Sequence, residues 1–192
     1  MRVKKGFKIF YLLISEGTTE FNIFAYLTTK KFRYLFEKSN VQFSVKAEII
    51  KNGNQIVSQG KLGGVGSLCG FQAKYNLVKS KYVGQRLFVL LDKDLDESEE
   101  IGNLIRSTND VVQFLEYNSE YLLLKLAKKK LRKPSEFASL NDFRTYCKSE
   151  FYKVFRKKTS DFKDSDFDQV FALVTDEEVR VEFKELFATL DL

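Results

Sequence analysis

The chain contains no histidine, and only two of its 192 residues are cysteines, Cys69 and Cys147. Without imidazole, it cannot by itself form a Ser-His-Asp triad, a Cys-His nucleophile or a histidine-ligated zinc site. Two cysteines provide neither a CxxC zinc knuckle nor a disulfide framework, which is typical of a reducing, cytoplasmic compartment. Any catalysis must therefore use carboxylates, lysine, arginine, hydroxyl groups and bound ions.

Long hydrophobic runs are also lacking. The mostly apolar stretch 7–14 is too short to cross a membrane and has no small-residue cleavage site, so we interpret it as a strand and expect no membrane partner. Apolar residues make up 44% of the chain and charged residues 30%, values typical of a soluble globular protein. The length fits one domain, or one domain with a helical annex.

Apolar periodicity predicts an α/β fold with a mainly parallel, four-stranded sheet flanked by helices. The predicted strands are 7–14, 41–50, 87–91 and 111–115, and the helices between and after them are 21–36, 71–81 and 98–106. From residue 118 onward the pattern is helical, with predicted helices 121–131, 143–155 and 179–190, the last after a capping box at 175–178. We therefore expect an α/β domain, 1–126, and a helical annex, 127–192, packed on it.

The net charge of +6 is unevenly distributed. Residues 125–158 contain twelve basic and three acidic side chains, whereas residues 159–192 contain ten acidic and three basic ones. This asymmetry indicates a surface that faces a polyanion beside an acidic segment that could cover it or dock on a partner. A Lys-rich run such as 128–133 can equally be a solvated helix face.

Carboxylates follow three of the predicted strands: Glu16 and Glu20 after the first, Asp92, Asp94 and Asp96 after the third, and Glu120 after the fourth. Ligands of open parallel sheets bind beyond the carboxyl ends of the strands. Carboxylates gathered there repel one another unless cations neutralise them, and hard oxygen ligands select Mg²⁺, Mn²⁺ or Ca²⁺. Two such ions would suit the cleavage of a phosphodiester.

Each acidic patch also has a simpler interpretation. Glu16 can be a solvated turn residue, and the 118–120 patch can be a helix cap with an acidic first turn. The 92–96 patch resembles the start of an EF-hand. That loop, however, needs Gly at the position where this chain has Glu97, and Glu at the position where it has Asn103. The Gly-rich segment 60–70 lacks the ending of a Walker loop, so we interpret it as a flexible loop that can face substrate.

The turn Glu16-Gly17-Thr18-Thr19-Glu20, the later Asp92-x-Asp94-x-Asp96 and the patch Asn118-Ser119-Glu120 together resemble a TOPRIM domain, the topoisomerase-primase metal fold. The resemblance covers about residues 7–126 and is strongest to the small RloB-like and OLD-type nucleases of prokaryotic defence systems. It implies a Mg²⁺-dependent activity on nucleic acid. The metal ligands that it implies are Glu16, Glu20, Asp92, Asp94 and Glu120. The third patch departs from the family pattern, because Asn118 replaces the expected serine. The resemblance therefore leaves open whether the protein binds one metal ion or two.

The leading hypothesis is a cytoplasmic nuclease that uses Mg²⁺ or Mn²⁺ to cut DNA or RNA in prokaryotic (phage) defence. Glu16, Asp92 and Asp94 are its expected catalytic residues, and Glu20, Asp96 and Glu120 are further expected metal ligands. Contacts to the nucleic-acid backbone are expected from Lys93, Lys125, Lys128, Lys129, Arg132, Arg156, Lys157 and Lys158.

Two alternatives remain. One is a non-catalytic TOPRIM-derived module that binds nucleic acid or a partner ATPase. The other, primase-type nucleotidyl transfer, is disfavoured by the short chain. The sequence leaves open whether an ATPase partner subunit takes part and whether the protein is a homo-oligomer.

Overall fold

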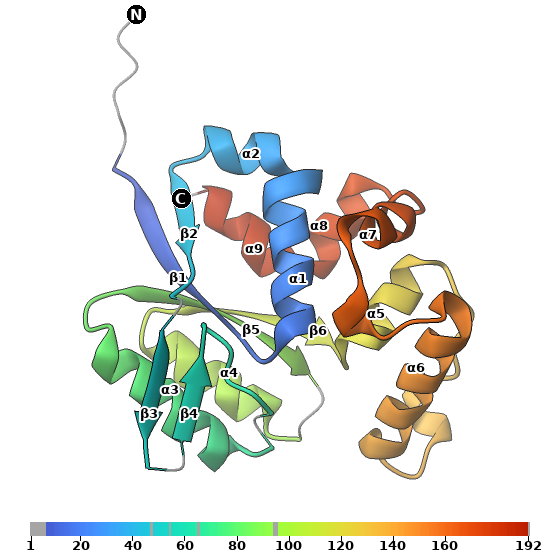
Figure 1. Ribbon diagram of the computed structural model, residues 1–192, viewed down its shortest axis with the longest axis horizontal. Helices are drawn as coiled ribbons and strands as arrows, with labels where there is room; N and C mark the ends of the chain where they lie inside the picture. Colours follow the sequence, from blue (N-terminus) through green and yellow to red (C-terminus); the bar gives the residue numbers. More distant parts are fainter. Residues whose placement is uncertain (1–6, 47, 54, 65, 94–95, 192) are drawn as a thin grey trace, which may run out of the picture.

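The computed structural model describes residues 7–46, 48–53, 55–64, 66–93 and 96–191 (Figure 1). At its centre lies a four-stranded sheet in the order β2-β1-β5-β6, in which every pairing is parallel. Its strands are β1 (Ile9–Ser15), β2 (Val41–Ser44), β5 (Arg86–Lys93) and β6 (Val111–Glu116). A separate antiparallel hairpin pairs β3 (Ile49–Asn52) with β4 (Gln55–Ser58). The predicted α/β class and the parallel four-stranded sheet are therefore confirmed.

Helices cover both faces of the sheet (Figure 1). On one face lie α1 (Thr18–Tyr26), α2 (Arg33–Lys38), α5 (Ser119–Leu126) and the later helices α7 (Asp164–Phe171), α8 (Asp176–Glu182) and α9 (Lys184–Ala188). The other face is covered by α3 (Leu68–Lys81) and α4 (Ser98–Ser107). The long helix α6 (Leu140–Phe155) packs against α5 at the side of the molecule.

Two hydrophobic clusters, one on each face, hold these layers together. Side chains alternate between the faces of a strand, so Tyr11 and Leu13 of β1 join one cluster while Leu12 and Ile14 join the other. The continuous apolar runs of β1 and β5 are thereby buried on both sides, which is the pattern expected of central parallel strands.

The helical annex shares one of these clusters with the sheet. Phe151 of α6, Phe167 of α7 and Phe183 lie in the same buried cluster as Phe24 of α1 and Phe88 of β5. The annex therefore packs on the first part of the chain through its core and not only through surface contacts. The division of the chain at residue 126 stays a prediction.

Gln113 fixes the end of the annex to the outer strand of the sheet. This β6 side chain is buried, and its Oε1 accepts hydrogen bonds from the backbone N–H groups of Glu185 and Leu186 at 3.0 and 3.4 Å. Its Nε2 donates to the backbone carbonyl of Glu182 at 3.1 Å. The Gln113 side chain therefore provides hydrogen-bond partners for backbone groups at the end of α8 and the start of α9 that have no partner within their own helix.

Replacing Gln113 with Ala should lower the free energy of unfolding by about 2 kcal/mol, because buried backbone groups at both helix ends would lose their partner. Urea denaturation followed by circular dichroism would measure this. The matched control is Gln42→Ala on β2, where the side chain is exposed and the change should stay within about 0.5 kcal/mol. Equal losses in the two variants would contradict the assignment of Gln113.

The predicted strand 41–50 was wrong as one element. The chain forms β2 on the edge of the sheet, leaves it after Ser44, and begins the β3–β4 hairpin at Ile49. Asn52 pairs with Gln55, so the hairpin turn is short, and Gly53 has the positive φ of 55° that such a turn needs. The alternating pattern continued across two different strands, and the return strand β4, which lies before the predicted loop 60–70, was not predicted.

The predicted helix 21–36 is also divided. A π-helical turn, η1 (Leu27–Lys31), separates α1 from α2. Thr28 and Thr29 donate their hydroxyl hydrogens to the carbonyls of Phe24 and Ala25 at 2.9 and 2.7 Å. Hydroxyls that bond back to the preceding turn disturb the regular helical ladder. Phe32 then leaves the helical conformation with φ −113°.

The predicted helix 121–131 ends earlier than expected, at Leu126. Lys128 adopts a left-handed conformation with φ 57°, and the N–H of Lys129 bonds back to the carbonyl of Leu124 at 3.0 Å. This closes the helix before Pro134 is reached. Leu131 lies beyond the end of the helix but is partly buried against the same hydrophobic cluster. The helix α7 was not predicted, although it has apolar residues at helical spacing in Phe167, Val170 and Phe171.

Within the described residues, no helix is both long enough and apolar enough to cross a membrane.

Candidate functional site at the strand ends

Glu16 and Asp92 lie at the carboxyl ends of the two central strands and are in contact. The Oε2 atom of Glu16 accepts a hydrogen bond from the backbone N–H of Asp92 at 3.3 Å. The backbone N–H of Glu16 in turn donates to the carbonyl of Leu90 on β5 at 2.9 Å. Glu16 is partly buried by these contacts, so it is not the solvated turn residue of the simpler interpretation.

The Gly-rich segment after β4 holds the backbone of Glu16 from the other side. The backbone N–H of Ser15 donates to the carbonyl of Gly60 at 2.8 Å. The backbone N–H of Leu62 donates to the carbonyl of Ser15, and that of Gly63 to the carbonyl of Glu16, at 2.9 Å each. Gly60 has φ +74°, and a Cβ at this position would lie 3.0 Å from the carbonyl oxygen of Leu13. Only glycine fits such a close approach. Residues 60–63 therefore position the carboxylate-bearing turn, a role that the sequence did not reveal.

Glu20 is buried one helical turn further on, in the first turn of α1. A Cβ on Gly17 would lie 2.9 Å from Glu20 Oε2, so the glycine of the Glu-Gly-Thr-Thr-Glu turn makes room for this carboxylate. Burial raises the pKa of Glu20, and the charge of Glu120 raises it further, against hydrogen bonds from the backbone and from Ser119 that lower it. Glu20 and Glu120 thus form a second pair, related by their electrostatic interaction.

Glu120 connects this pair to the annex. Its Oε1 accepts a hydrogen bond from the hydroxyl of Thr159 at 3.0 Å, and Thr159 in turn accepts one from Thr19 at 3.3 Å. The thiol of Cys147 on α6 is buried, and its pKa is raised to about 12 by burial and, secondarily, by the charge of Glu120. This thiol therefore stays protonated near neutral pH and is not a nucleophile.

Residues 118–120 form a helix cap, so the simpler interpretation of this patch is correct. The Asn118 side chain accepts a hydrogen bond from the N–H of Tyr121 at 2.8 Å and begins α5. The acidic first turn places Glu120 close to the positive end of the helix dipole. The cap does not remove Glu120 from the site, because its carboxylate is directed to Thr159 and influences Glu20.

The predicted metal ligands therefore form two pairs. The carboxylate of Glu16 accepts from the backbone N–H of Asp92, and Glu20 and Glu120 interact electrostatically. Asp94 lies outside the described residues, and Asp96 is exposed in the turn before α4. Among the residues that the structure describes, no group of three or more Asp, Glu or Cys side chains is arranged to hold a metal ion.

No family model, curated protein or solved structure matches this chain.

The predicted nucleic-acid-binding residues fall into two groups. Four are in ion pairs: Lys125 with Glu116 and Glu182, Lys128 with Glu178, Arg132 with Glu136, and Lys157 with Asp166. Lys93, Lys129, Arg156 and Lys158 are exposed, and over the described part of the chain they have no ion pair. Three of the four paired cations bind carboxylates of the acidic segment 159–192, so this segment covers part of the basic stretch.

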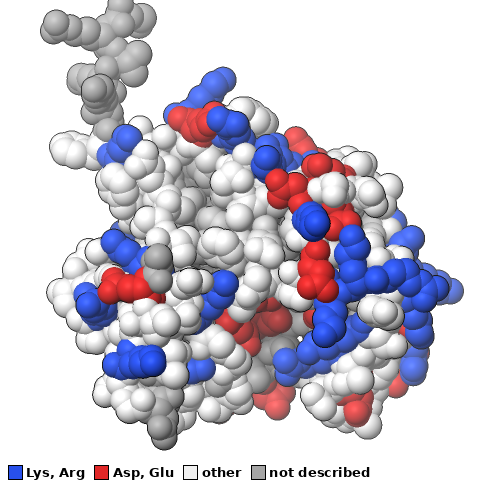
Figure 2. Space-filling model, in the orientation of Figure 1, with Lys and Arg blue, Asp and Glu red and all other residues white. Residues whose placement is uncertain are grey.

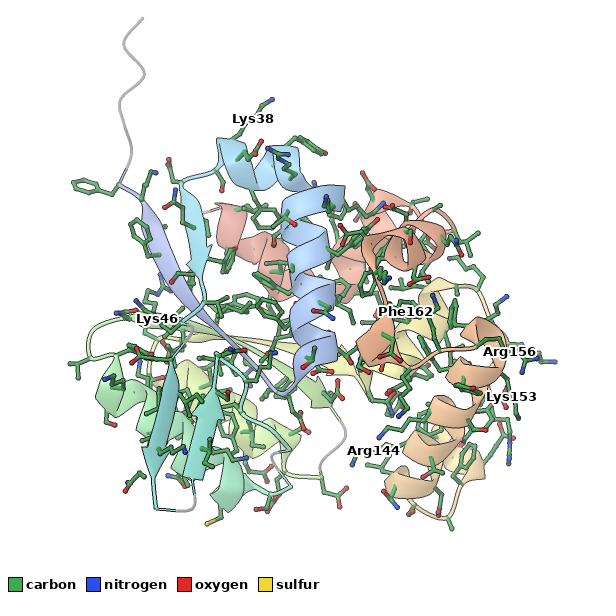
Figure 3. All side chains as sticks on the ribbon, in the orientation of Figure 1. Lys38, Lys46, Arg144, Lys153, Arg156 and Phe162 are labelled. Carbon is green, nitrogen blue, oxygen red and sulfur yellow. The ribbon has the colours of Figure 1, made fainter. Side chains whose placement is uncertain are left out.

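Basic side chains lie on two sides of the annex. Figure 2 shows Lys and Arg side chains concentrated over the annex, next to acidic side chains in the hollow between it and the sheet. In Figure 3, Arg144 lies on the side of α6 that is turned toward the sheet, whereas Lys153 and Arg156 extend outward. The basic surface therefore has an inner side near the carboxylates and an outer side in solvent.

A cavity of about 480 Å³ lies on the annex next to Glu120. It is formed between α6 and the short helix η3 (Thr159–Asp161), and we call it the α6–η3 cavity. Its lining contains Glu120, Lys148, Ser149, Phe151, Tyr152, Lys157, Lys158, Thr159 and Ser160. The sequence indicated Lys157 and Lys158, but not Lys148 or Thr159, because nothing in the local pattern shows which annex residues would meet the carboxylate of Glu120.

Proposed function

We propose that the protein is a divalent-metal-dependent nuclease of TOPRIM-like fold that cleaves phosphodiester bonds in DNA or RNA. The observation that carries this proposal is that the carboxylate of Glu16, directly after β1, accepts a hydrogen bond from the backbone N–H of Asp92 in the neighbouring parallel strand β5, at the edge where such sheets bind ligands. Their position next to a cationic annex supports a polyanionic substrate. A role in prokaryotic defence rests on the resemblance to RloB-like and OLD-type nucleases alone.

The donor set fits Mg²⁺ or Mn²⁺. Magnesium is usually bound by one or two carboxylates together with water and substrate phosphate, and not by a complete protein cage. Glu16 and Asp92 would hold such an ion, which when bound supplies a Lewis acid for the phosphoryl oxygen and an activated water. The described residues offer no third carboxylate beside this pair, which favours one protein-bound ion over two.

The exposed cations would hold the substrate backbone. Lys129, Arg156 and Lys158 are exposed on the annex without an ion pair among the described residues, and Lys93 is exposed at the end of β5. Phosphate contacts of this kind fix the position of a strand without reading its sequence. Lys125, Lys128 and Lys157 contribute less, because each must give up a carboxylate partner before it binds phosphate.

A second candidate function is a non-catalytic TOPRIM-derived module that binds nucleic acid or a partner ATPase. The absence of a group of three metal-ligating side chains from the described residues favours it. Such a module would bind nucleic acid without any need for a divalent ion.

Cleavage assays distinguish the two candidates. Labelled single- and double-stranded DNA and RNA would be incubated with the full chain in Mg²⁺, in Mn²⁺ and in EDTA, and the products separated on denaturing gels. We expect shortened products with either ion and none in EDTA, because the ion stabilises the charge that develops on the phosphate. Binding of every substrate with no cleavage in any ion would contradict the nuclease and support the module. Primer synthesis from ribonucleotides in the same mixture would instead indicate a primase.

A further inference from the structure

The α6–η3 cavity brings together chemical groups that the two carboxylate pairs do not supply. Three lysines, two serine hydroxyls, two aromatic rings and the carboxylate of Glu120 line one concave space. Binding sites for small molecules typically combine apolar walls with a few convergent polar groups. The lining therefore suits a ligand that has both an anionic group and a flat ring.

We propose that the α6–η3 cavity binds one nucleoside 5′-monophosphate unit at the end of a nucleic-acid strand. This inference rests on the proposed function, since it names the part of the substrate that the annex would hold. It goes beyond sequence-independent backbone contacts, because a cavity of about 480 Å³ has room for the base and sugar of one nucleotide as well as its phosphate.

Lys148 and Lys158 provide the phosphate-binding part of the cavity. Both side chains are exposed, and neither forms an ion pair with another of the described residues. Lys157, by contrast, bonds Asp166 Oδ1 at 2.7 Å, so Asp166 already neutralises its charge. The ammonium groups of Lys148 and Lys158 and the hydroxyls of Ser149 and Ser160 can bind a phosphate by charge-assisted hydrogen bonds.

Tyr152 provides a surface for the base. Its side chain is 55% exposed, although it lies one residue after the buried Phe151 on α6. An exposed aromatic ring on a rigid helix next to cations is the arrangement on which single-stranded bases stack. The neighbouring Phe155 packs against Phe151 and Phe162 and is therefore part of the core.

The negative charge of Glu120 disfavours ligands that carry several phosphates. Its carboxylate lines the same space and accepts only one hydrogen bond from the described residues, that of Thr159. A carboxylate repels a long phosphate chain but can accept hydrogen bonds from a sugar hydroxyl or a base amino group. The lining therefore favours a single phosphate over a triphosphate.

Isothermal titration calorimetry on the full chain in EDTA and low salt would test this, with adenosine 5′-monophosphate, adenosine, inorganic phosphate and ATP as probes. We expect the monophosphate to bind at least about tenfold more tightly than adenosine or phosphate alone, because only it uses both parts of the cavity. Lys158→Ala should weaken its binding about fivefold or more, and Tyr152→Ala about tenfold. The matched control is Lys130→Ala, since Lys130 is exposed on the annex without an ion pair among the described residues and does not line the cavity, and it should change binding less than about twofold.

Equal weakening by Lys158→Ala and Lys130→Ala would overturn the proposal, because it would show general attraction to a basic surface. Tighter binding of ATP than of the monophosphate would also overturn it. The absence of EDTA-resistant binding of the monophosphate would have the same effect. Binding is measured without a divalent ion, so failure of this inference is separate from failure of the nuclease, which the cleavage assays test. Monophosphate binding without cleavage would support the cavity and contradict the nuclease.

Discussion

Replacing Asp92 with Asn should lower the rate of divalent-ion-dependent cleavage by at least about 100-fold. The variant keeps the backbone N–H that donates to Glu16, so the strand ends should stay in place. It removes the Asp92 carboxylate, and with it negative charge that would attract a cation. The Lewis-acid contribution of a metal is several kcal/mol, and about 1.4 kcal/mol corresponds to tenfold in rate.

Glu16→Gln should have a similar effect, because the amide oxygen can still accept the hydrogen bond from Asp92 while the charge is lost. The matched control is Glu99→Gln, a carboxylate exposed on α4 outside both pairs, and it should retain full activity. Thermal denaturation of all three variants would show that folding is preserved. Wild-type cleavage rates in both Asp92→Asn and Glu16→Gln would remove these residues from the active site.

The contact between Glu16 and Asp92 could be predicted from sequence because it follows from topology. Both residues come directly after apolar runs, and the carboxyl ends of neighbouring parallel strands meet at one edge. The order of alternating strands and helices also determined the fold class. These features depend on patterns within about ten residues of chain, which the sequence displays directly.

Features that depend on packing between distant segments could not be predicted. The Thr159 hydroxyl of η3 bonds Glu120 of α5, and the charge of Glu120 acts on Cys147 because α6 packs against α5. No periodic pattern encodes either relation. The acidic segment 159–192 was expected to cover the basic stretch or dock on a partner, but which lysines it neutralises appears only in the structure. The burial of Gln113 has the same origin, since a glutamine in a strand ordinarily indicates an exposed position.

Asp110 is the charged side chain on which the packing of α3 against the sheet depends. Its side chain is 1% exposed and lies just before β6. One oxygen accepts from the backbone N–H of Leu87 on β5 at 2.8 Å. The other oxygen, Oδ2, accepts hydrogen bonds from the hydroxyls of Tyr75 on α3 and of Thr108. It also accepts one from Lys79 Nζ on α3 at 2.9 Å. Burial raises the pKa of Tyr75, and its hydrogen bond to Asp110 raises it further, so this phenol stays protonated and donates at neutral pH.

Replacing Asp110 with Ala should therefore lower the free energy of unfolding by about 3 to 5 kcal/mol, because it breaks a buried ion pair and leaves buried donors without an acceptor. Urea denaturation followed by circular dichroism would measure the loss. The matched control is Asp161→Ala in η3, whose exposed side chain should cost less than about 0.5 kcal/mol. Lys79→Ala should cost less than Asp110→Ala, since it removes one donor from a carboxylate that keeps three others. If Asp110→Ala were no more destabilising than Asp161→Ala, the carboxylate would not be what joins α3 to the two strands.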